Sequence, residues 1–347
     1  MVSSIGNCVK YYAPKDVRIE EMKEIPKISI GEVLVKIEAC AICGTDVKSF
    51  VSGNPRIKPP QVMGHELCGT IVELGEDVEN YKIGQRVTMA TTIGCGDCYY
   101  CNKGKTNMCR NAEAMGFNYS GAMAPYAVIP AKAVKQNHLV DIGDLDATVA
   151  SLSEPMSCAI NDINRVPEEE LENVLIWGLG PLGMLHALCA REKGVKNIVC
   201  VGFPGKRSDM ARDMGLTVLT PDEIDGKFKE LSKVEGFDLV LITAPNNGVQ
   251  SKAPLYARKG GYVSYFASLP VGDEMLSMNS RTIHYNELVL YGTSDSTVKH
   301  VQAAVDLLRK NPDGFRPLIT HVMPFSDFHK AIDEIKARNA VKIVLVP

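Results

Sequence analysis

The sequence predicts an α/β protein of two domains, one mostly β and one built on a doubly wound parallel sheet. The chain has 347 residues, which is longer than a chain that folds around a single hydrophobic core usually is. Residues 1–155 are rich in glycine, proline and short strand-like runs, whereas from residue 173 apolar strands alternate with helical stretches. We therefore expect one domain at 1–155, completed by 295–347, and a second at 156–294.

Composition and charge exclude several classes of function. Hydrophobic residues make up 45% and charged residues 23% of the chain, as in ordinary globular proteins. The net charge of -3 gives no basic footprint for nucleic acid, and no apolar run reaches the length of a membrane span. The N-terminal stretch lacks a signal-peptide pattern, so we expect a cytoplasmic protein. The eleven cysteines are then better explained as thiols or metal ligands than as disulfides.

In the first domain, four cysteines lie within "CGDCYYCNKGKTNMC". They are Cys95, Cys98, Cys101 and Cys109. Two-residue gaps let one turn present two thiolates to one ion, and nearby glycines allow the chain to wrap tightly. Four protein ligands leave no open coordination position, so we expect a structural zinc site. A four-iron cluster and a group of unliganded thiols remain as alternatives.

A second set of metal-ligating residue types is spread along the same domain. Cys43 lies in "AICGTD", His65 and Glu66 lie in "MGHELCG", and Glu154 lies in "SEPMSCA". A soft sulfur, an imidazole and carboxylates with one open position are typical of a catalytic zinc. Each residue alone would more often be structural, so the prediction depends on the combination with the nucleotide-binding pattern that follows.

In the second domain, the stretch "NVLIWGLGPLGMLHALCAREKGVKNIVCVG" reads as a strand (174–177), a glycine turn, a helix and a second strand (197–201). The turn has the G-x-G-x-x-G pattern, whose glycines let a pyrophosphate approach a helix N-terminus. The predicted cofactor-binding residues of this turn are Gly178, Gly180, Pro181, Leu182 and Gly183.

Further strands are predicted along the rest of the chain, with helical stretches between them. They cover 237–244, 260–268 and 287–293, and a helix follows from about Val298. The C-terminal "ARNAVKIVLVP" is strand-like, and we expect it to return to the first domain.

Together these motifs resemble the zinc-containing medium-chain dehydrogenase/reductase family, over essentially the whole chain. The "GHE" box, the four-cysteine stretch and "GLGPLG" occur in the family's order and spacing, and Glu66 with "SEPMSC" is similar to the sorbitol dehydrogenase branch. The resemblance implies a GroES-like domain followed by a Rossmann domain. It also implies a catalytic zinc held by Cys43, His65 and Glu66, with Glu154 as a further ligand or a partner of the bound water.

The resemblance further implies that Thr45 passes the substrate proton while hydride moves to a nicotinamide. The chain has Lys48 and Ser49 where sorbitol dehydrogenases carry a His-Tyr pair, so Lys48 becomes a candidate for the proton route. The arginine-tyrosine pair of sorbitol dehydrogenases is also absent, and "YGTSDST" offers Asp295 and Ser296 instead. Sorbitol itself is therefore disfavoured as the substrate.

The residue that follows the second strand of the Rossmann domain bears on cofactor choice. NAD enzymes carry an acidic residue there to hold the adenosine ribose, but this chain has Gly202. Lys206 and Arg207 follow and could bind a 2′-phosphate, although both could equally be solvated surface charges. We therefore predict a preference for NADP(H) over NAD(H).

The leading functional hypothesis is oxidation of a secondary alcohol on a polyol, sugar alcohol or sugar alcohol phosphate. Arg56 and Lys58 in "GNPRIKPP" are speculative phosphate ligands, with a solvated charged loop as the alternative. Threonine- or aldose-type dehydrogenases remain alternatives, as does a catalytically silent nucleotide- or zinc-binding protein. A zinc-ribbon nucleic-acid binder is opposed by the acidic balance. The resemblance also implies a homodimer or homotetramer, with "ELVLYGT" as an edge strand that could pair across subunits.

Overall fold

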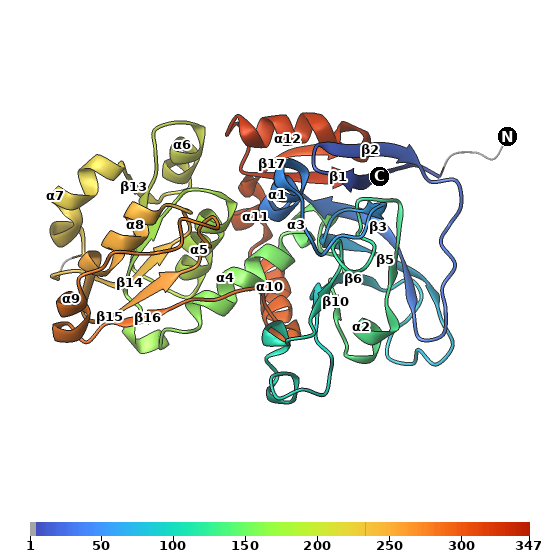
Figure 1. The fold of residues 1–347 in the computed structure, drawn as a ribbon, viewed down its shortest axis with the longest axis horizontal. Helices are drawn as coiled ribbons and strands as arrows, with labels where there is room; N and C mark the ends of the chain where they lie inside the picture. The colour runs from blue at the N-terminus through green and yellow to red at the C-terminus, as the bar shows by residue number, and fades with distance from the viewer. Residues whose placement is uncertain (1–4, 233) are drawn as a thin grey trace. The chain divides into compact units, whose positions relative to one another are not determined.

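The fold is described from a computed structural model, which covers residues 5–232 and 234–347 (Figure 1). The chain separates into two compact units, unit 1 with Met1–Ser157 and Asp295–Pro347, and unit 2 with Cys158–Ser294. No helix in the described ranges is long and apolar enough to cross a bilayer.

Unit 1 is built on a sheet with the order β10-β6-β5-β3-β18-β17, in which β9 also pairs with β3. A small sheet, β2-β1-β4, and the two-stranded β7-β8 complete its strands. The bounds are β1 (Asn7–Ala13), β2 (Asp16–Glu21), β3 (Val33–Ala41), β4 (Gln61–Val62), β5 (Glu66–Leu74), β6 (Arg86–Met89), β7 (Thr92–Ile93), β8 (Glu113–Ala114), β9 (Tyr126–Ile129), β10 (Leu139–Asp141), β17 (Ile319–Pro324) and β18 (Lys342–Val346).

The central strands of unit 1 are rich in the apolar β-branched residues that suit a packed sheet. The C-terminal strand β18 pairs antiparallel with β3, which places Val344 opposite Ala41. The helices of this unit are α1 (Gly44–Ser52), α2 (Ala131–Lys135), α3 (Ala147–Ala150), the first residues of α4 (Ser153–Ile163), α10 (Val298–Lys310), α11 (Pro312–Phe315) and α12 (Phe328–Lys336). The apolar faces of α1, α2 and α12 pack with the sheet in one buried core.

Unit 2 is a parallel sheet with the order β13-β12-β11-β14-β15-β16. Relabelled along the chain this is 3-2-1-4-5-6, the strand order of the dinucleotide-binding Rossmann fold. Its elements are β11 (Asn173–Trp177), α5 (Pro181–Glu192), β12 (Asn197–Val201), α6 (Lys206–Asp213), β13 (Thr217–Leu219), α7 (Pro221–Leu231), β14 (Phe237–Ile242), α8 (Asn247–Lys252), β15 (Ala257–Tyr265), α9 (Ser280–Tyr285) and β16 (Val289–Tyr291). The predicted parallel sheet is thereby confirmed.

One predicted strand has clearly different bounds in the structure. The sequence predicted a strand over 260–268, beginning at Gly260. Instead β15 begins at Ala257, which pairs with Phe237, and the register shifts before Tyr262 pairs with Leu239. The glycine pair therefore forms an irregularity within the strand, a recognised place for glycine.

Candidate functional site

Strand pairing brings three of the predicted metal ligands together in unit 1. β3 and β5 run antiparallel with Ala41 opposite Glu66, so Cys43, just past the end of β3, lies beside the start of β5. One ligand atom each from Cys43, His65 and Glu66 lies within 4.8 Å of the others. This convergence, from segments far apart in the sequence, is what a metal ion requires of a sulfur, an imidazole nitrogen and a carboxylate.

A buried lysine accompanies this group. Lys342 begins β18, and its ammonium forms an ion pair with the Glu66 carboxylate, with both side chains almost wholly buried. Burial opposes the charged ammonium, but the charges of Glu66 and Cys43 outweigh it and leave the pKa of Lys342 above its usual value. The sequence analysis missed this residue, and its only signal was a lone cation at the start of the apolar run "KIVLV".

The His65 ring is held between a hydroxyl and a carboxylate. Its Nε2 lies 3.4 Å from Thr45 Oγ1, and its Nδ1 lies 3.7 Å from Asp46 Oδ1. Asp46 is fixed in turn because its other oxygen accepts a hydrogen bond from the Cys43 backbone N–H at 2.9 Å. The buried Nδ1 makes no hydrogen bond among the described residues. A carboxylate behind a histidine ring is the arrangement that orients a metal-binding imidazole.

Glu154 lies near this group, in the first turn of α4. It is not among the ligand atoms that cluster within 4.8 Å in the described part of the chain. Thr91 Oγ1 donates to Glu154 Oε1 at 3.5 Å. Protein around the carboxyl group removes water from it and raises its pKa to about 7, against the influence of His65. A nearby metal ion would favour the ionised form of Glu154 over the protonated form. Glu154 therefore suits a position beside a metal ion.

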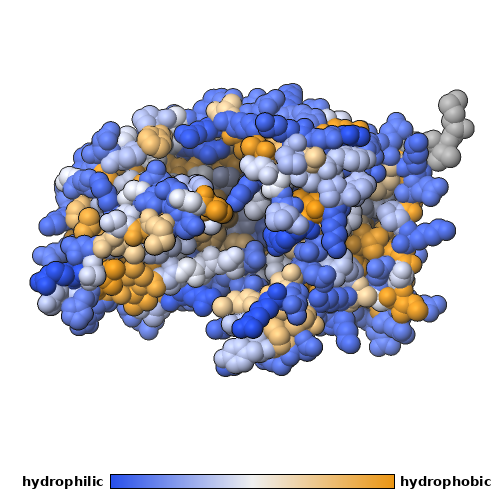
Figure 2. Space-filling model, in the orientation of Figure 1, coloured by the Kyte–Doolittle hydropathy of each residue, from blue (hydrophilic) through white to orange (hydrophobic). Residues whose placement is uncertain are grey.

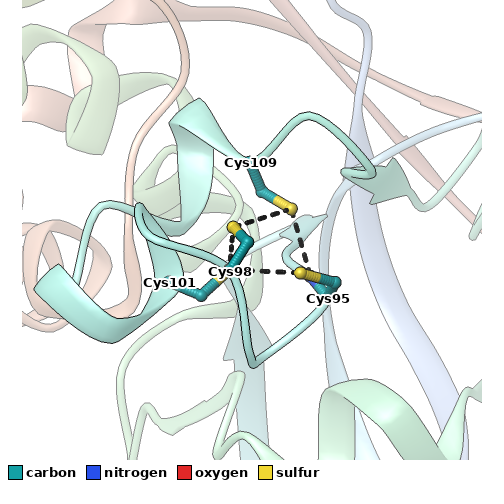
Figure 3. Close-up of side chains that lie close together, drawn as sticks. All are labelled: Cys95, Cys98, Cys101 and Cys109. Carbon is teal, nitrogen blue, oxygen red and sulfur yellow. Dashed lines mark hydrogen bonds between the residues drawn. The ribbon is translucent and has the colours of Figure 1, made fainter.

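The four cysteines of the predicted structural site also converge (Figure 3). Sulfur–sulfur distances are 3.9 Å for Cys95–Cys101, 3.6 Å for Cys98–Cys101 and 3.8 Å for Cys98–Cys109. Four sulfurs in a tetrahedron at a zinc–sulfur distance of about 2.3 Å are separated by about 3.8 Å. An iron–sulfur cluster places several atoms between the cysteines and would hold them farther apart, so the spacing fits a single zinc ion.

The backbone around the four cysteines requires glycine at two positions. A Cβ at Gly94 would lie 2.6 Å from Cys101 Sγ, and Gly96 has φ +93. Backbone N–H groups also point at the sulfurs, and that of Cys95 donates to Cys109 Sγ at 3.2 Å. Such donors favour thiolates, the form that binds metal.

In unit 2, the glycine turn lies at the carboxyl ends of β11 and β14, where doubly wound sheets bind their ligands. A Cβ at Gly183 would lie 1.8 Å from Gly178 O, so only glycine allows this approach. Thr243 Oγ1 donates to the same oxygen at 3.0 Å. A Cβ at Gly180 would meet nothing within 4 Å. Space is therefore open at the N-terminus of α5, which begins with Pro181 and Leu182.

The predicted ribose-binding position also depends on glycine. A Cβ at Gly202 would lie 2.6 Å from Leu179 Cδ1, so a carboxylate side chain does not fit there unless Leu179 moves. Gly205, with φ +138, caps α6, which begins with Lys206 and Arg207. Lys206 is exposed and Arg207 half-buried, and they lie five and six residues after Val201, the end of β12.

The remaining predicted site residues are Arg56, Lys58 and Lys48. Arg56 lies close to it, with its Cζ 4.4 Å from the centre of the Phe117 ring, which packs 5.1 Å from the His65 ring. The positive charge of Lys58 contributes to lowering the pKa of Glu113. Lys48 is exposed on α1, one turn after Thr45, and its place in the proton route stays a prediction.

Comparisons with known proteins agree with this geometry. Residues 29–138 match the family model "Alcohol dehydrogenase GroES-like domain", and residues 181–310 match "Zinc-binding dehydrogenase". The L-threonine 3-dehydrogenase of Pyrococcus furiosus is 32% identical over 93% of each chain.

Two solved structures have the same fold along nearly the whole chain. A protein described as a zinc-binding dehydrogenase of Sinorhizobium meliloti 1021, bound to NADP, has a TM-score of 0.89 and 26% identity, covering 98% of this chain and 99% of its own. A protein described as a short chain alcohol dehydrogenase of E. coli CFT073, in complex with NADH, has a TM-score of 0.87 and 25% identity over the same shares. Together with the family models, they confirm the predicted pairing of a GroES-like and a Rossmann fold.

Proposed function

Since the chain belongs to the zinc-containing medium-chain dehydrogenase/reductase family, we propose that it oxidises the secondary hydroxyl of a threonine-type 3-hydroxy amino acid. The chain is an oxidoreductase of the zinc-dependent alcohol dehydrogenase type, and its predicted resemblance to the family is confirmed. The observation that carries the proposal is the convergence of Cys43, His65 and Glu66 beside the Thr45 hydroxyl.

We assign the two metal positions from their donor sets. Cys43, His65 and Glu66 would hold a catalytic zinc, with Glu154 as a further ligand or a partner of a bound water. When bound, this ion supplies Lewis-acid chemistry and lowers the pKa of the hydroxyl that it polarises. The second position is a structural zinc held by Cys95, Cys98, Cys101 and Cys109.

The residues around the first metal position have separate tasks. Asp46 orients the His65 ring through Nδ1, as carboxylates placed behind metal-binding histidines do. Thr45 Oγ1 is the hydroxyl that accepts the substrate proton, and because Thr45 is itself exposed it can release that proton to water. Lys48 is not needed for this route, and its role stays a prediction. A bound nicotinamide would supply the hydride acceptor that balances the oxidation of the alcohol to a ketone.

The substrate class follows from relatives and from charge. The named relatives favour the threonine-type alternative over the polyol reading that the sequence put first. Polyols remain the second candidate because Glu66 and "SEPMSC" are similar to the sorbitol dehydrogenase branch. For a phosphorylated polyol, Arg56 and Lys58 stay the candidate phosphate ligands.

We propose NADP(H) as the preferred cofactor. Support comes from the absence of a carboxylate at Gly202, from the Leu179 side chain that fills this space, and from the cations at the start of α6. One structural neighbour is bound to NADP and another is in complex with NADH, so a nicotinamide dinucleotide is common to both. Replacing Lys206 and Arg207 with alanine should weaken NADP⁺ binding about tenfold or more and change NAD⁺ binding little, as measured by calorimetry.

We also propose a homodimer or homotetramer. Within the described residues β16 pairs only with β15, and Val289 on this edge strand is 45% exposed. Figure 2 shows hydrophobic surface in the area where Figure 1 places β15 and β16. An exposed apolar edge strand invites pairing with another chain.

We also propose a cytoplasmic location, which is supported by the eleven cysteines without a disulfide.

The test is a substrate survey with zinc-loaded protein. L-threonine, free polyols, polyol phosphates and aldoses are each supplied with NADP⁺ or NAD⁺, and nicotinamide absorbance is followed. We expect the highest kcat/KM with L-threonine and NADP⁺. A higher value for a polyol would overturn the substrate assignment. The absence of turnover with every compound, with zinc confirmed bound, would favour a silent binding protein.

A further inference from the structure

The segment that follows the last Rossmann strand is pinned beside the metal site in unit 1. Ser296 Oγ lies 2.6 Å from Ser157 Oγ, and Ser157 Oγ donates to Glu154 O at 2.5 Å, so Ser296 donates to Ser157. Thr297 caps α10 together with His300. Asp295 is therefore next in sequence to Ser296, which is hydrogen-bonded to Ser157 on α4, the helix that carries Glu154.

The backbone at Asp295 is unusual. Its φ is +55, in the left-handed region that residues other than glycine rarely adopt, although aspartate tolerates it better than most. Such a conformation persists only where the surroundings impose it, and it concentrates at functional sites. The left-handed backbone therefore marks Asp295 as a candidate functional residue.

The Asp295 carboxylate lies within electrostatic range of His65, one of the candidate metal ligands. Two consecutive threonines bind the two carboxylates of this region, Thr91 to Glu154 and Thr92 to Asp295. The surrounding protein raises the pKa of Asp295, while the positive charges of Arg56 and His65 favour its ionised form. The side chain keeps part of its surface accessible to solvent.

Arg56 is the second exposed charge of this region. Its guanidinium covers one ring face of Phe117, and Phe117 packs against His65. The stacking holds a cation of fixed position within the reach of a molecule bound near His65. An exposed anion and an exposed cation therefore both lie near the candidate ligand His65, within unit 1.

We propose that Asp295 and Arg56 select a zwitterionic substrate, with Asp295 binding its ammonium group and Arg56 its carboxylate. The assignment rests on the proposed function and deepens it by naming the residues that recognise the substrate. A neutral polyol needs neither charge, and a substrate phosphate would be repelled by Asp295. A 3-hydroxy amino acid matches both charges while its hydroxyl reaches the metal position.

The test compares Asp295→Asn with the wild type on L-threonine and on 2,3-butanediol, which has a secondary hydroxyl but no charge. The variant keeps an acceptor oxygen but loses the negative charge that faces the ammonium group, so kcat/KM for L-threonine should fall about tenfold to a hundredfold more than that for 2,3-butanediol. Arg56→Gln should show the same selective loss. Asp77→Asn serves as the matched control, because Asp77 is also an exposed aspartate with positive φ, at +69.

Equal losses on both substrates would make Asp295 a structural residue and overturn the proposal, as would no loss on either. Calorimetry of L-threonine binding to the zinc-loaded proteins separates this outcome from failure of the proposed function. If the wild type binds L-threonine and Asp295→Asn does not, yet no hydride is transferred, the recognition pair stands and the proposed oxidation falls. If the wild type oxidises L-threonine and Asp295→Asn retains the same substrate preference, the reverse holds.

Discussion

The two metal-binding groups of unit 1 are built in opposite ways. The four cysteines lie within fifteen residues of one another, and three of the four are only partly buried. Cys43, His65 and Glu66 come from segments joined only by sheet pairing, and His65 and Glu66 are buried. The first group closes around an ion by local wrapping, whereas the second depends on the whole sheet.

The surroundings differ as much as the ligands do. Four thiolates complete a tetrahedron, so the cysteine group has no position for a substrate. The second group is flanked by Thr45, Asp46, Glu154 and Lys342, which can move protons, orient a ring or balance charge. The difference teaches that a closed set of identical ligands serves stability, while a mixed set with charged neighbours serves chemistry.

The largest expected effect concerns the buried group. Cys43→Ala removes a ligand that polarisation of the substrate requires, and we expect kcat/KM to fall about 1000-fold or more, which corresponds to about 4 kcal/mol. The zinc bound by the four cysteines should remain, which metal analysis would detect. If Cys43→Ala kept its activity but lost both ions, the division between the two groups would be wrong.

The reciprocal change is Cys98→Ser in the cysteine group. Loss of one of four ligands opens the structural site, and we expect a destabilisation of about 3 kcal/mol, or roughly 6–12 °C in Tm. Activity measured well below the new Tm should stay within a fewfold of the wild type. Calorimetric scans with and without a chelator provide the measurement, because chelation should lower the Tm of the wild type toward that of the variant.

The same contrast explains how much could be predicted from the sequence. The cysteine group and the glycine turn are local patterns, so their spacing alone predicted convergence, and the sulfur distances agree with it. Lys342 could not be foreseen as the partner of Glu66, because β18 reaches β3 only in the folded sheet. Asp295 was noted in the sequence only as a departure from a family pattern. Its left-handed backbone and its position near Arg56 are tertiary facts.

Lys342 offers a way to sharpen the comparison. Lys342→Met leaves the buried Glu66 carboxylate without its ammonium partner, and breaking such a pair costs about 3–5 kcal/mol. Bound zinc would offset part of this cost, because the metal also neutralises Glu66. We therefore expect the loss of stability in urea unfolding to be larger after chelation than before it. The exposed Lys299→Met serves as the control, and a loss independent of zinc would argue that Glu66 is not a ligand.

The smallest expected effect is a pH dependence that belongs to neither metal group. Glu38 accepts hydrogen bonds from Arg86 at 2.6 Å and from Thr70 at 2.6 Å, and the Arg86 guanidinium lowers the pKa of Glu38 below its usual value. A carboxyl group whose pKa is lower in the folded state stabilises the protein above its unfolded pKa of about 4.3. That stabilisation is lost as the pH falls further, through the folded pKa.

Glu38→Gln isolates this contribution from the metals. Acid also protonates thiolates and releases zinc, so the acid unfolding of the wild type contains both effects. Because the pair is partly exposed, we expect the variant to be less stable by about 1 kcal/mol at pH 7, with the difference shrinking toward zero near pH 3. Urea unfolding across this range, with zinc chelated throughout, gives the comparison. A constant difference at every pH would attribute the effect to packing and not to the Glu38 charge.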